Sequence, residues 1–187
     1  MKNTCIFDLK HTALSAADRV SRQRGASLLE GIAYLGIAAI VVLGAVSLLT
    51  GAFGSAKSNQ ATEEVVAIRT GIRKLYIGQT YPAAMLPSLI TSNAIPNTLA
   101  RGAGGTTLSN SWGGAVTAVG TGGAFSITYN AVPQDVCINM ISGASGWTQI
   151  DQAGANAITS FPATVAGATA LCSVVGATGN AVTFTAS

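Results

Sequence analysis

The sequence predicts an α+β protein in which one long N-terminal helix precedes a series of strands. Two patterns of side chains predict this order. No charged residue occurs from Gly31 to Ala56, and beyond this run apolar residues recur at helical spacing as far as Ile77. Farther along the chain, apolar and polar residues alternate instead, most regularly over 124–129 and 181–186, as they do in half-buried strands.

The charge-free run is long enough to cross a membrane. As a helix its 26 residues would span about 39 Å, more than the roughly 30 Å of a bilayer core. Residues 1–25 carry five basic and two acidic side chains, a net charge of +3, whereas the rest of the chain carries five of each. We therefore expect residues 1–25 on the cytoplasmic side and the C-terminus outside. The neutral remainder has no basic stripe, so no nucleic-acid partner is expected.

The helix is expected to continue beyond the membrane. After Lys57 apolar residues fall three and four positions apart, while Glu63 and Glu64 fall off this apolar face. We therefore expect one helix from about Ser27 to about Ile77, apolar on all sides in its first half and on one face in its second. Within the first half, Gly44, Gly51 and Gly54 lower the helix propensity. They fit either close packing between helices or a segment that loosens on assembly.

The C-terminal part is expected to contain short helices and strands joined by loops. A glycine-rich turn between two alternating segments predicts a hairpin, and Pro133 fits the first position of a helix. Gly179 and Asn180 are expected to form a turn. The expected elements are a short helix within 83–92, an exposed loop over 101–114, strands 115–119, 124–129 and 147–150, helices 134–141 and 162–172, and strand 181–186.

The most informative motif stands at the head of the apolar run, in Arg24-Gly25-Ala26-Ser27-Leu28-Leu29-Glu30. A lone carboxylate within a membrane helix costs about 2.5–3.5 kcal/mol, so Glu30 must find a partner or stay at the interface. A basic leader ending in glycine, followed by glutamate at the fifth position of the new chain and about twenty apolar residues, resembles the N-terminus of type IV pilins.

The resemblance implies how the N-terminus is processed. A prepilin peptidase would cut between Gly25 and Ala26 and methylate the new amino group, although Ala26 stands where the family more often has Phe, Met or Leu. Residues 1–25 would then be a removed leader, 26–54 a transmembrane and polymerisation helix, and 55–187 an exported globular domain. Glu30 would act in assembly, beside the amino group of a neighbouring subunit.

The second half resembles the type IVb pilins, the subclass of the toxin-coregulated, bundle-forming and colonisation-factor pilins. The shared features are a Trp-Gly-Gly, an alternating strand ending in Tyr, a Val-Pro, a Cys-containing helix, a second Cys and a terminal Thr-Phe-Thr strand. The 25-residue leader and the 162-residue mature chain also suit this subclass. The implied fold is the pilin ladle, a long N-terminal helix, half membrane-spanning and half packed on an antiparallel sheet.

The resemblance also implies function and location. The chain would be the major pilin of an adhesive, aggregating and colonising filament, not an enzyme, with no cofactor and no metal. Its partners would be other copies of itself, the prepilin peptidase, the inner-membrane assembly machinery and, before assembly, the membrane. It would move from the inner membrane to an extracellular filament. Adhesion and bundling are expected to map to the loop surfaces of 101–114 and 142–162, because exposed loops favour binding residues.

Cysteine usage agrees with export. Cys5 lies in the expected leader, so the mature chain would keep Cys137 and Cys172, which favours one disulfide in an oxidising compartment. The bond would close a loop of about 35 residues, which stabilises a fold by roughly 3–4 kcal/mol. Metal binding is the weaker alternative, because two distant thiolates have no further partner and the lone histidine, His11, is in the leader.

Other readings of the sequence remain open. Within the pilin class the chain could be a minor pilin or a type II secretion pseudopilin. A different class would be a membrane-anchored periplasmic binding domain that never polymerises, and a secretory signal cut after Ala56 is a further alternative. Only 9% of the residues are charged, against about 25% in typical proteins, which fits a densely packed extracellular assembly or compositional drift. Gly25 together with Glu30 separates the pilin class from the membrane-anchored binding domain, because a plain anchor needs neither residue.

Overall fold

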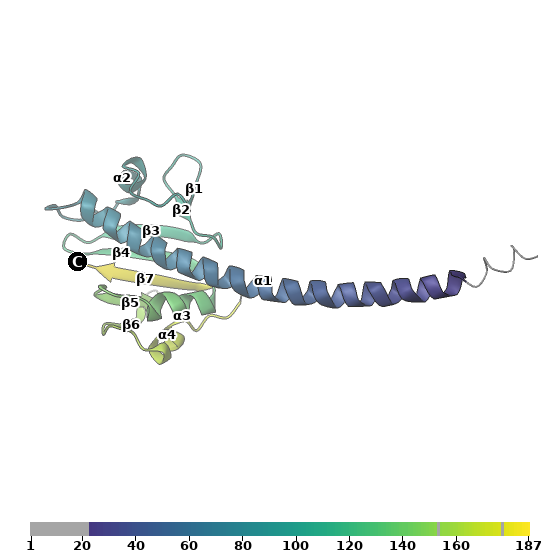
Figure 1. The fold of residues 1–187 in the computed structure, drawn as a ribbon. Helices are drawn as coiled ribbons and strands as arrows, with labels where there is room; N and C mark the ends of the chain where they lie inside the picture. The colour runs from purple at the N-terminus through teal and green to yellow at the C-terminus, as the bar shows by residue number, and fades with distance from the viewer. Residues whose placement is uncertain (1–22, 153, 177) are drawn as a thin grey trace, which may run out of the picture. The chain divides into compact units, whose positions relative to one another are not determined.

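The computed structural model describes residues 23–152, 154–176 and 178–187. It contains two compact units, and the boundary between them falls between Gly51 and Ala52. One helix, α1 (Gln23–Leu75), contributes to both units, and a seven-stranded sheet follows it (Figure 1). The predicted α+β class, with a long N-terminal helix before an antiparallel sheet, is confirmed. The helix begins four residues earlier and ends two residues earlier than expected.

In the first unit α1 carries apolar side chains that nothing in the chain covers. Leu35, Leu43 and Leu48 expose 70%, 71% and 79% of their surface, and their neighbours are similar. Within the part of the chain that the structure describes, α1 is the one helix long and apolar enough to span a membrane, with a mean hydropathy of 2.5 over an 18-residue window. A helix that is apolar all round needs lipid or other helices around it.

In the second unit α1 buries one face against the sheet. Ala61, Val65, Ile68 and Ile72 follow one another at spacings of four, three and four, and each is at most 2% exposed. The expectation that Glu64 lies off this face is wrong, because Glu64 is only 3% exposed. Its position explains this, since Glu64, Ile68 and Ile72 are four residues apart and therefore share one row of the helix.

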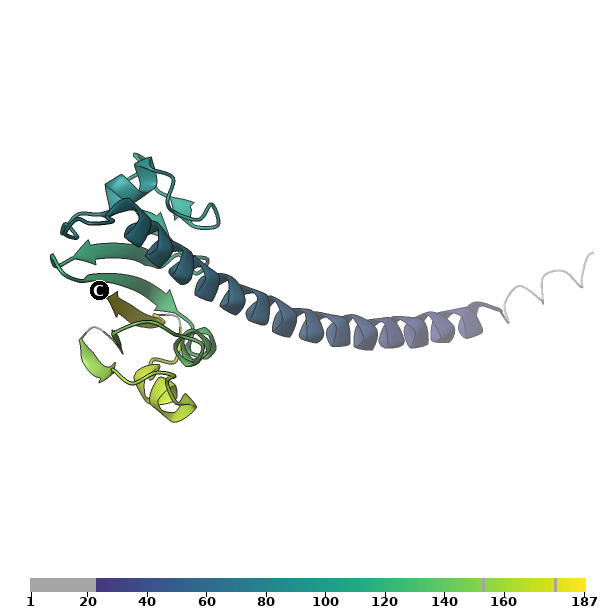
Figure 2. The same cartoon turned by 60° about the vertical axis from the view of Figure 1, so that its left-hand side comes forward.

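The sheet is antiparallel throughout and has the order β1-β2-β3-β4-β7-β5-β6. The last strand of the chain enters between β4 and β5, so the sheet is complete only when the C-terminus is in place (Figure 2). The strands are β1 (Ala100–Arg101), β2 (Leu108–Ser109), β3 (Ala115–Gly120), β4 (Phe125–Val132), β5 (Gln149–Gln152), β6 (Ala155–Ile158) and β7 (Asn180–Ala186).

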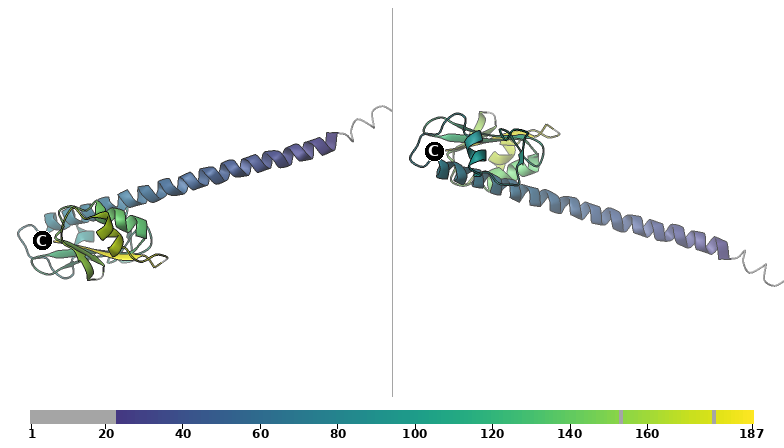
Figure 3. Two further views of the ribbon diagram at one scale, coloured as in Figure 1. Left: turned by 90° about the horizontal axis from the view of Figure 1, so that it is seen from below. Right: turned by 90° about the horizontal axis from the view of Figure 1, so that it is seen from above.

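Three further helices surround the sheet. They are α2 (Leu86–Thr91), α3 (Gln134–Ser142) and α4 (Val165–Leu171). The part of α1 in this unit and α3 lie on the same face of the sheet (Figures 1 and 3), where Val65, Met140 and Phe184 line one small cavity of about 30 Å³. The alternating residues of β4 and β7 point their large apolar side chains toward these helices. On the opposite face the residues of β4 and β7 are small and uncharged, and Thr128 and Thr183 share a side-chain hydrogen bond of 3.0 Å there.

Two segments expected to form loop surfaces contain strands. The expected loop 101–114 holds part of β1 and all of β2, and 142–162 holds β6 and β5, which overlaps the expected strand 147–150. A two-residue strand is too short to show alternation, and the Ala and Asn residues of β6 have low strand propensity. Pairing with neighbouring strands fixes these segments instead. The hairpin, the strand at 181–186 and the helix after Pro133 are confirmed, with each boundary within three residues of the expected one.

Candidate functional site

The processing motif lies at the start of α1. The backbones of Gly25 and Ala26 belong to the first turn of the helix, and Glu30 follows four residues later, about 6 Å farther along the axis. The side chain of Glu30 is exposed, beside Leu28 and Leu29, which are 68% and 73% exposed. Residues 1–22, most of the expected leader, lie outside the described residues. The helix therefore presents one carboxylate on an apolar surface that requires a covering partner.

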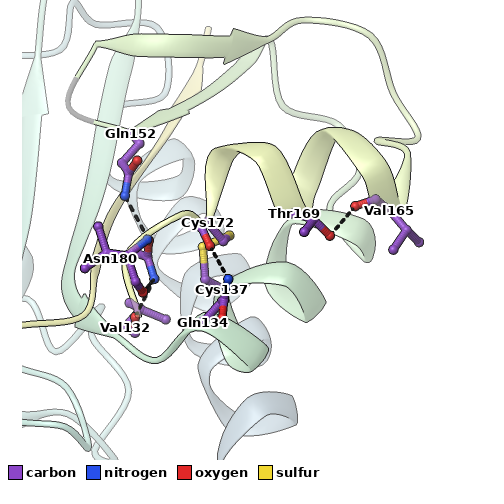
Figure 4. Close-up of a disulfide and its surroundings, with 9 residues drawn as sticks. Val132, Gln134, Cys137, Gln152, Val165, Thr169, Cys172 and Asn180 are labelled. Atoms are coloured by element: carbon purple, nitrogen blue, oxygen red, sulfur yellow. Dashed lines mark hydrogen bonds between the residues drawn. A yellow bond between two sulfur atoms is a disulfide. The ribbon is translucent and has the colours of Figure 1, made fainter. Parts of the chain in front are cut away.

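The second predicted feature is a disulfide bond between Cys137 and Cys172 (Figure 4). Cys137 lies on α3 and Cys172 caps the end of α4, with Cα atoms 5.9 Å apart and both side chains fully buried. The Gln134 side chain donates a hydrogen bond of 2.9 Å to the Cys172 carbonyl oxygen, beside the bridge. The bond encloses β5, β6 and α4, so this whole lobe is tied to α3.

A buried asparagine holds the end of this lobe against the sheet. Asn180 is fully buried and donates from Nδ2 to the carbonyl oxygens of Val132, at 3.2 Å, and Val174, at 3.0 Å. Its Oδ1 accepts hydrogen bonds from Gln152 Nε2 at 2.9 Å and from the Val174 amide at 3.0 Å (Figure 4). The expectation that Asn180 is a turn residue is wrong. The sequence did indicate its burial, because Asn180 lies an even number of positions before the buried residues of β7 and therefore points to the same face of the strand.

The backbone at Gly179, the residue before Asn180, has a conformation and a close contact that only glycine accepts. Its φ is +62°, and a Cβ placed there would lie 2.4 Å from the backbone carbonyl carbon of Ala131. Larger residues are therefore excluded where the chain enters β7.

The buried Glu64 carboxylate also has polar neighbours inside the domain. Gln60 Nε2 donates to Glu64 Oε1 at 2.8 Å, one turn along α1. The Tyr129 hydroxyl of β4 approaches Glu64 too loosely for a hydrogen bond of ordinary geometry. Burial, reinforced by the negative charge of Glu64, raises the pKa of Tyr129 above its ordinary value. The pair links α1 to the centre of the sheet.

Arg69 fastens α1 to the segment after α3. Its guanidinium donates to the carbonyl oxygens of Ser145, at 3.3 Å, and Gly146, and lies 4.8 Å from the centre of the Trp147 ring. Partial burial, with a smaller contribution from Arg73, lowers the pKa of Arg69, although a guanidinium remains charged in proteins. Arg69 is therefore a structural cation of the domain.

Asp151, Asp135 and Trp147 have structural surroundings. Asp151 is 6% exposed and accepts from the Gly154 amide at 2.7 Å and from Gln149 Nε2 at 3.0 Å. Asp135 lies in the first turn of α3, where a negative charge favours the helix N-terminus. Trp147 packs on Phe184, with ring centres 5.2 Å apart.

Comparison with known proteins adds two findings. The crystal structure of a type IVb pilin from Salmonella typhi is similar, with a TM-score of 0.55 and 28% identity over 67% of this chain and 97% of that one. A family model described as PilS N terminal matches residues 55–187. Comparison with curated protein sequences finds no match.

The antiparallel sheet, the long apolar helix before it and the disulfide together define a type IVb pilin. The chain belongs to the PilS family of these pilins. Members of this family are structural subunits rather than enzymes, and the family implies assembly into pilus filaments.

Proposed function

We propose that this chain is the major subunit of a type IVb pilus, cut after Gly25, methylated on Ala26 and polymerised through α1. The observation that carries the proposal is the exposed apolar surface of α1 with Glu30 at its head. Such a surface is costly in water, and either lipid or a bundle of identical helices would cover it. The two environments correspond to a precursor in the inner membrane and a subunit in an extracellular filament.

Glu30 would control how the helices dock. After cleavage the new amino group at Ala26 lies one helical turn away from Glu30, so each subunit carries a cation and an anion at the same end of α1. In a staggered bundle the Glu30 carboxylate of one subunit meets the amino group of its neighbour. Because an unpaired buried charge is strongly disfavoured, this contact selects one register among many apolar alternatives.

The remaining partners follow from this role. The prepilin peptidase acts on the cytoplasmic side at Gly25 and Ala26, and the inner-membrane assembly machinery moves the processed subunit into the filament. Adhesion and filament bundling would depend on surfaces within 101–114 and 142–162. Among cells that carry equal numbers of filaments, substitutions of exposed residues there should change aggregation and cell adherence, whereas those on the exposed side of 57–77 should not. The reverse pattern would contradict the assignment.

Filaments sheared from cells that express the chain provide the test. We expect this chain to be their most abundant protein, with an N-terminal peptide that starts at methylated Ala26. Filaments that contain it only in trace amounts would favour a minor pilin or a pseudopilin. A cell without filaments in which the chain keeps Met1 would favour the anchored binding domain, and an N-terminus at Lys57 would indicate signal-peptide cleavage.

A further inference from the structure

The outer side of α1 in the second unit carries a regular stripe of exposed residues. The stripe consists of Asn59, Glu63, Val66, Thr70 and Arg73 of α1 and of Ile77, two residues beyond its end, all exposed and spaced by four and three in alternation. This is the spacing at which one helix packs along another. Val66 and Ile77 expose 48% and 81% of their surface within it. The stripe therefore combines apolar contact area with charges at defined positions.

The acidic end of the stripe borders a polar groove of about 540 Å³, here called the Glu63 groove. It is lined by Ser58, Asn59, Thr62 and Glu63 of α1 and by Asn139 near the end of α3. Glu63 and Asp135 are the exposed acidic side chains among the described residues of this unit. A cation from outside the subunit thus has few acidic groups to contact, and one of them stands at this groove.

The basic end borders a second groove of about 430 Å³, here called the basic groove. It is lined by Arg69, Thr70, Arg73, Lys74 and Ile77. Arg73 donates one hydrogen bond of 2.6 Å to the Ser187 carbonyl oxygen and keeps other N–H groups for a second acceptor. The two grooves lie along one side of α1. Residues 59, 66 and 73 are seven positions apart, and each step of seven rotates the side chain by only about 20° around the helix axis.

We infer that Glu63 of one subunit docks at the basic groove of a second copy of this chain, with the two stripes packed side by side. The inference rests on the proposed polymerisation, in which all α1 helices run parallel. Because ten or eleven residues separate Glu63 from Arg73 and Lys74, the copies must be displaced along the helix axis by about 15–17 Å. Each subunit then offers an acid to one neighbour and a basic groove to another.

This contact has the symmetry of a filament. An interface between two different surface patches continues from subunit to subunit, whereas a self-complementary interface closes into a dimer. Complementary charge fits a second copy better than a polyanion, because Glu63 and the apolar Val66 occupy the same stripe and a polyanion would be repelled by the acid. The contact also sets an axial offset independently of Glu30, since each subunit in a filament has several neighbours.

Crosslinking in intact filaments tests the inference. The full chain would carry Glu63→Cys with Lys74→Cys, and sheared filaments would be treated with a short bis-maleimide, which spares the native disulfide. We expect a ladder of covalent multimers on a reducing gel and no ladder from either single variant. The matched control is Asp135→Cys with Lys74→Cys, in which the first cysteine replaces the other exposed acid of the domain in place of Glu63.

A charge exchange gives a second readout. Glu63→Arg alone, or Arg73→Glu with Lys74→Glu, should lower filament number about tenfold, and the combined triple variant should restore it, while Asp135→Arg has no effect. Abundant filaments without a ladder, or a ladder only from the Asp135 pair, would overturn the inference and leave the proposed function intact. Failure of the unaltered chain to form filaments would overturn both.

Discussion

Replacing Asn180 with alanine removes the four hydrogen bonds that hold the start of β7. The bond to Val132 is fully buried, and losing it leaves a carbonyl oxygen without a donor, at a cost of about 1–3 kcal/mol. The bonds to Val174 and from Gln152 are partly buried, so water replaces them in part. Adding about 0.5 kcal/mol for each gives an expected loss of about 3 kcal/mol in the free energy of unfolding.

The assay is urea unfolding of the detergent-extracted subunit, followed by tryptophan fluorescence. Trp147 is a suitable probe because it is 6% exposed and packs on Phe184 of β7. With an urea dependence of about 2 kcal/mol per molar, a loss of about 3 kcal/mol lowers the midpoint by about 1.5 M. Asn139→Ala is the matched control, because Asn139 is exposed on α3 and its replacement should change stability by no more than about 0.5 kcal/mol.

Equal midpoints for Asn180→Ala and Asn139→Ala would refute the reasoning. They would mean that the buried asparagine does not hold the disulfide-bounded lobe on the sheet. A lower midpoint with an unchanged slope would support it, since the surface exposed on unfolding would be the same.

Two further predictions concern the same domain. Cys137→Ser should lower the free energy of unfolding by roughly 3–4 kcal/mol, because the bridge closes a loop with a sequence separation of 35, and two free thiols in the unreduced parent would contradict this. Burial raises the pKa of Tyr129, so the folded state keeps a proton that the unfolded state loses above about pH 10. Its stabilising contribution is therefore complete below that pH and declines above it by up to about 1.4 kcal/mol per pH unit. Tyr129→Phe should remove this part of the alkaline decline in urea midpoints, and equal declines in parent and variant would contradict the assignment.

Much of the fold could be predicted from the sequence because its signals are long or strictly periodic. The charge-free run and the spacing of Val65, Ile68 and Ile72 predict α1, and strict alternation predicts β7. The two-residue strands β1 and β2 could not be predicted, because two residues are too few to show the alternation of a strand.

The polar interior could not be read directly from residue type. Glu64 and Asn180 are among the residue types that usually stay at the surface, yet tertiary packing buries both. Their positions in the sequence did indicate burial, because Glu64 shares a helical row with Ile68 and Ile72, and Asn180 alternates in step with the buried residues of β7. The prediction gave more weight to their polar side chains and was therefore wrong. For the candidate site, the motif at Gly25 and Glu30 could be recognised from sequence, whereas the Glu63 groove depends on how α1 and α3 pack.

The central claim is that Glu30 directs polymerisation of α1, and electron microscopy of cells that express Glu30→Ala tests it most directly. Asp135→Ala is the matched control, because it removes an exposed acid from the domain instead of from the apolar helix. We expect Glu30→Ala to be cleaved after Gly25 and to keep the unfolding midpoint of the parent, yet to form few or no filaments, while Asp135→Ala forms them normally. Filaments of normal number and length on Glu30→Ala cells would contradict the claim.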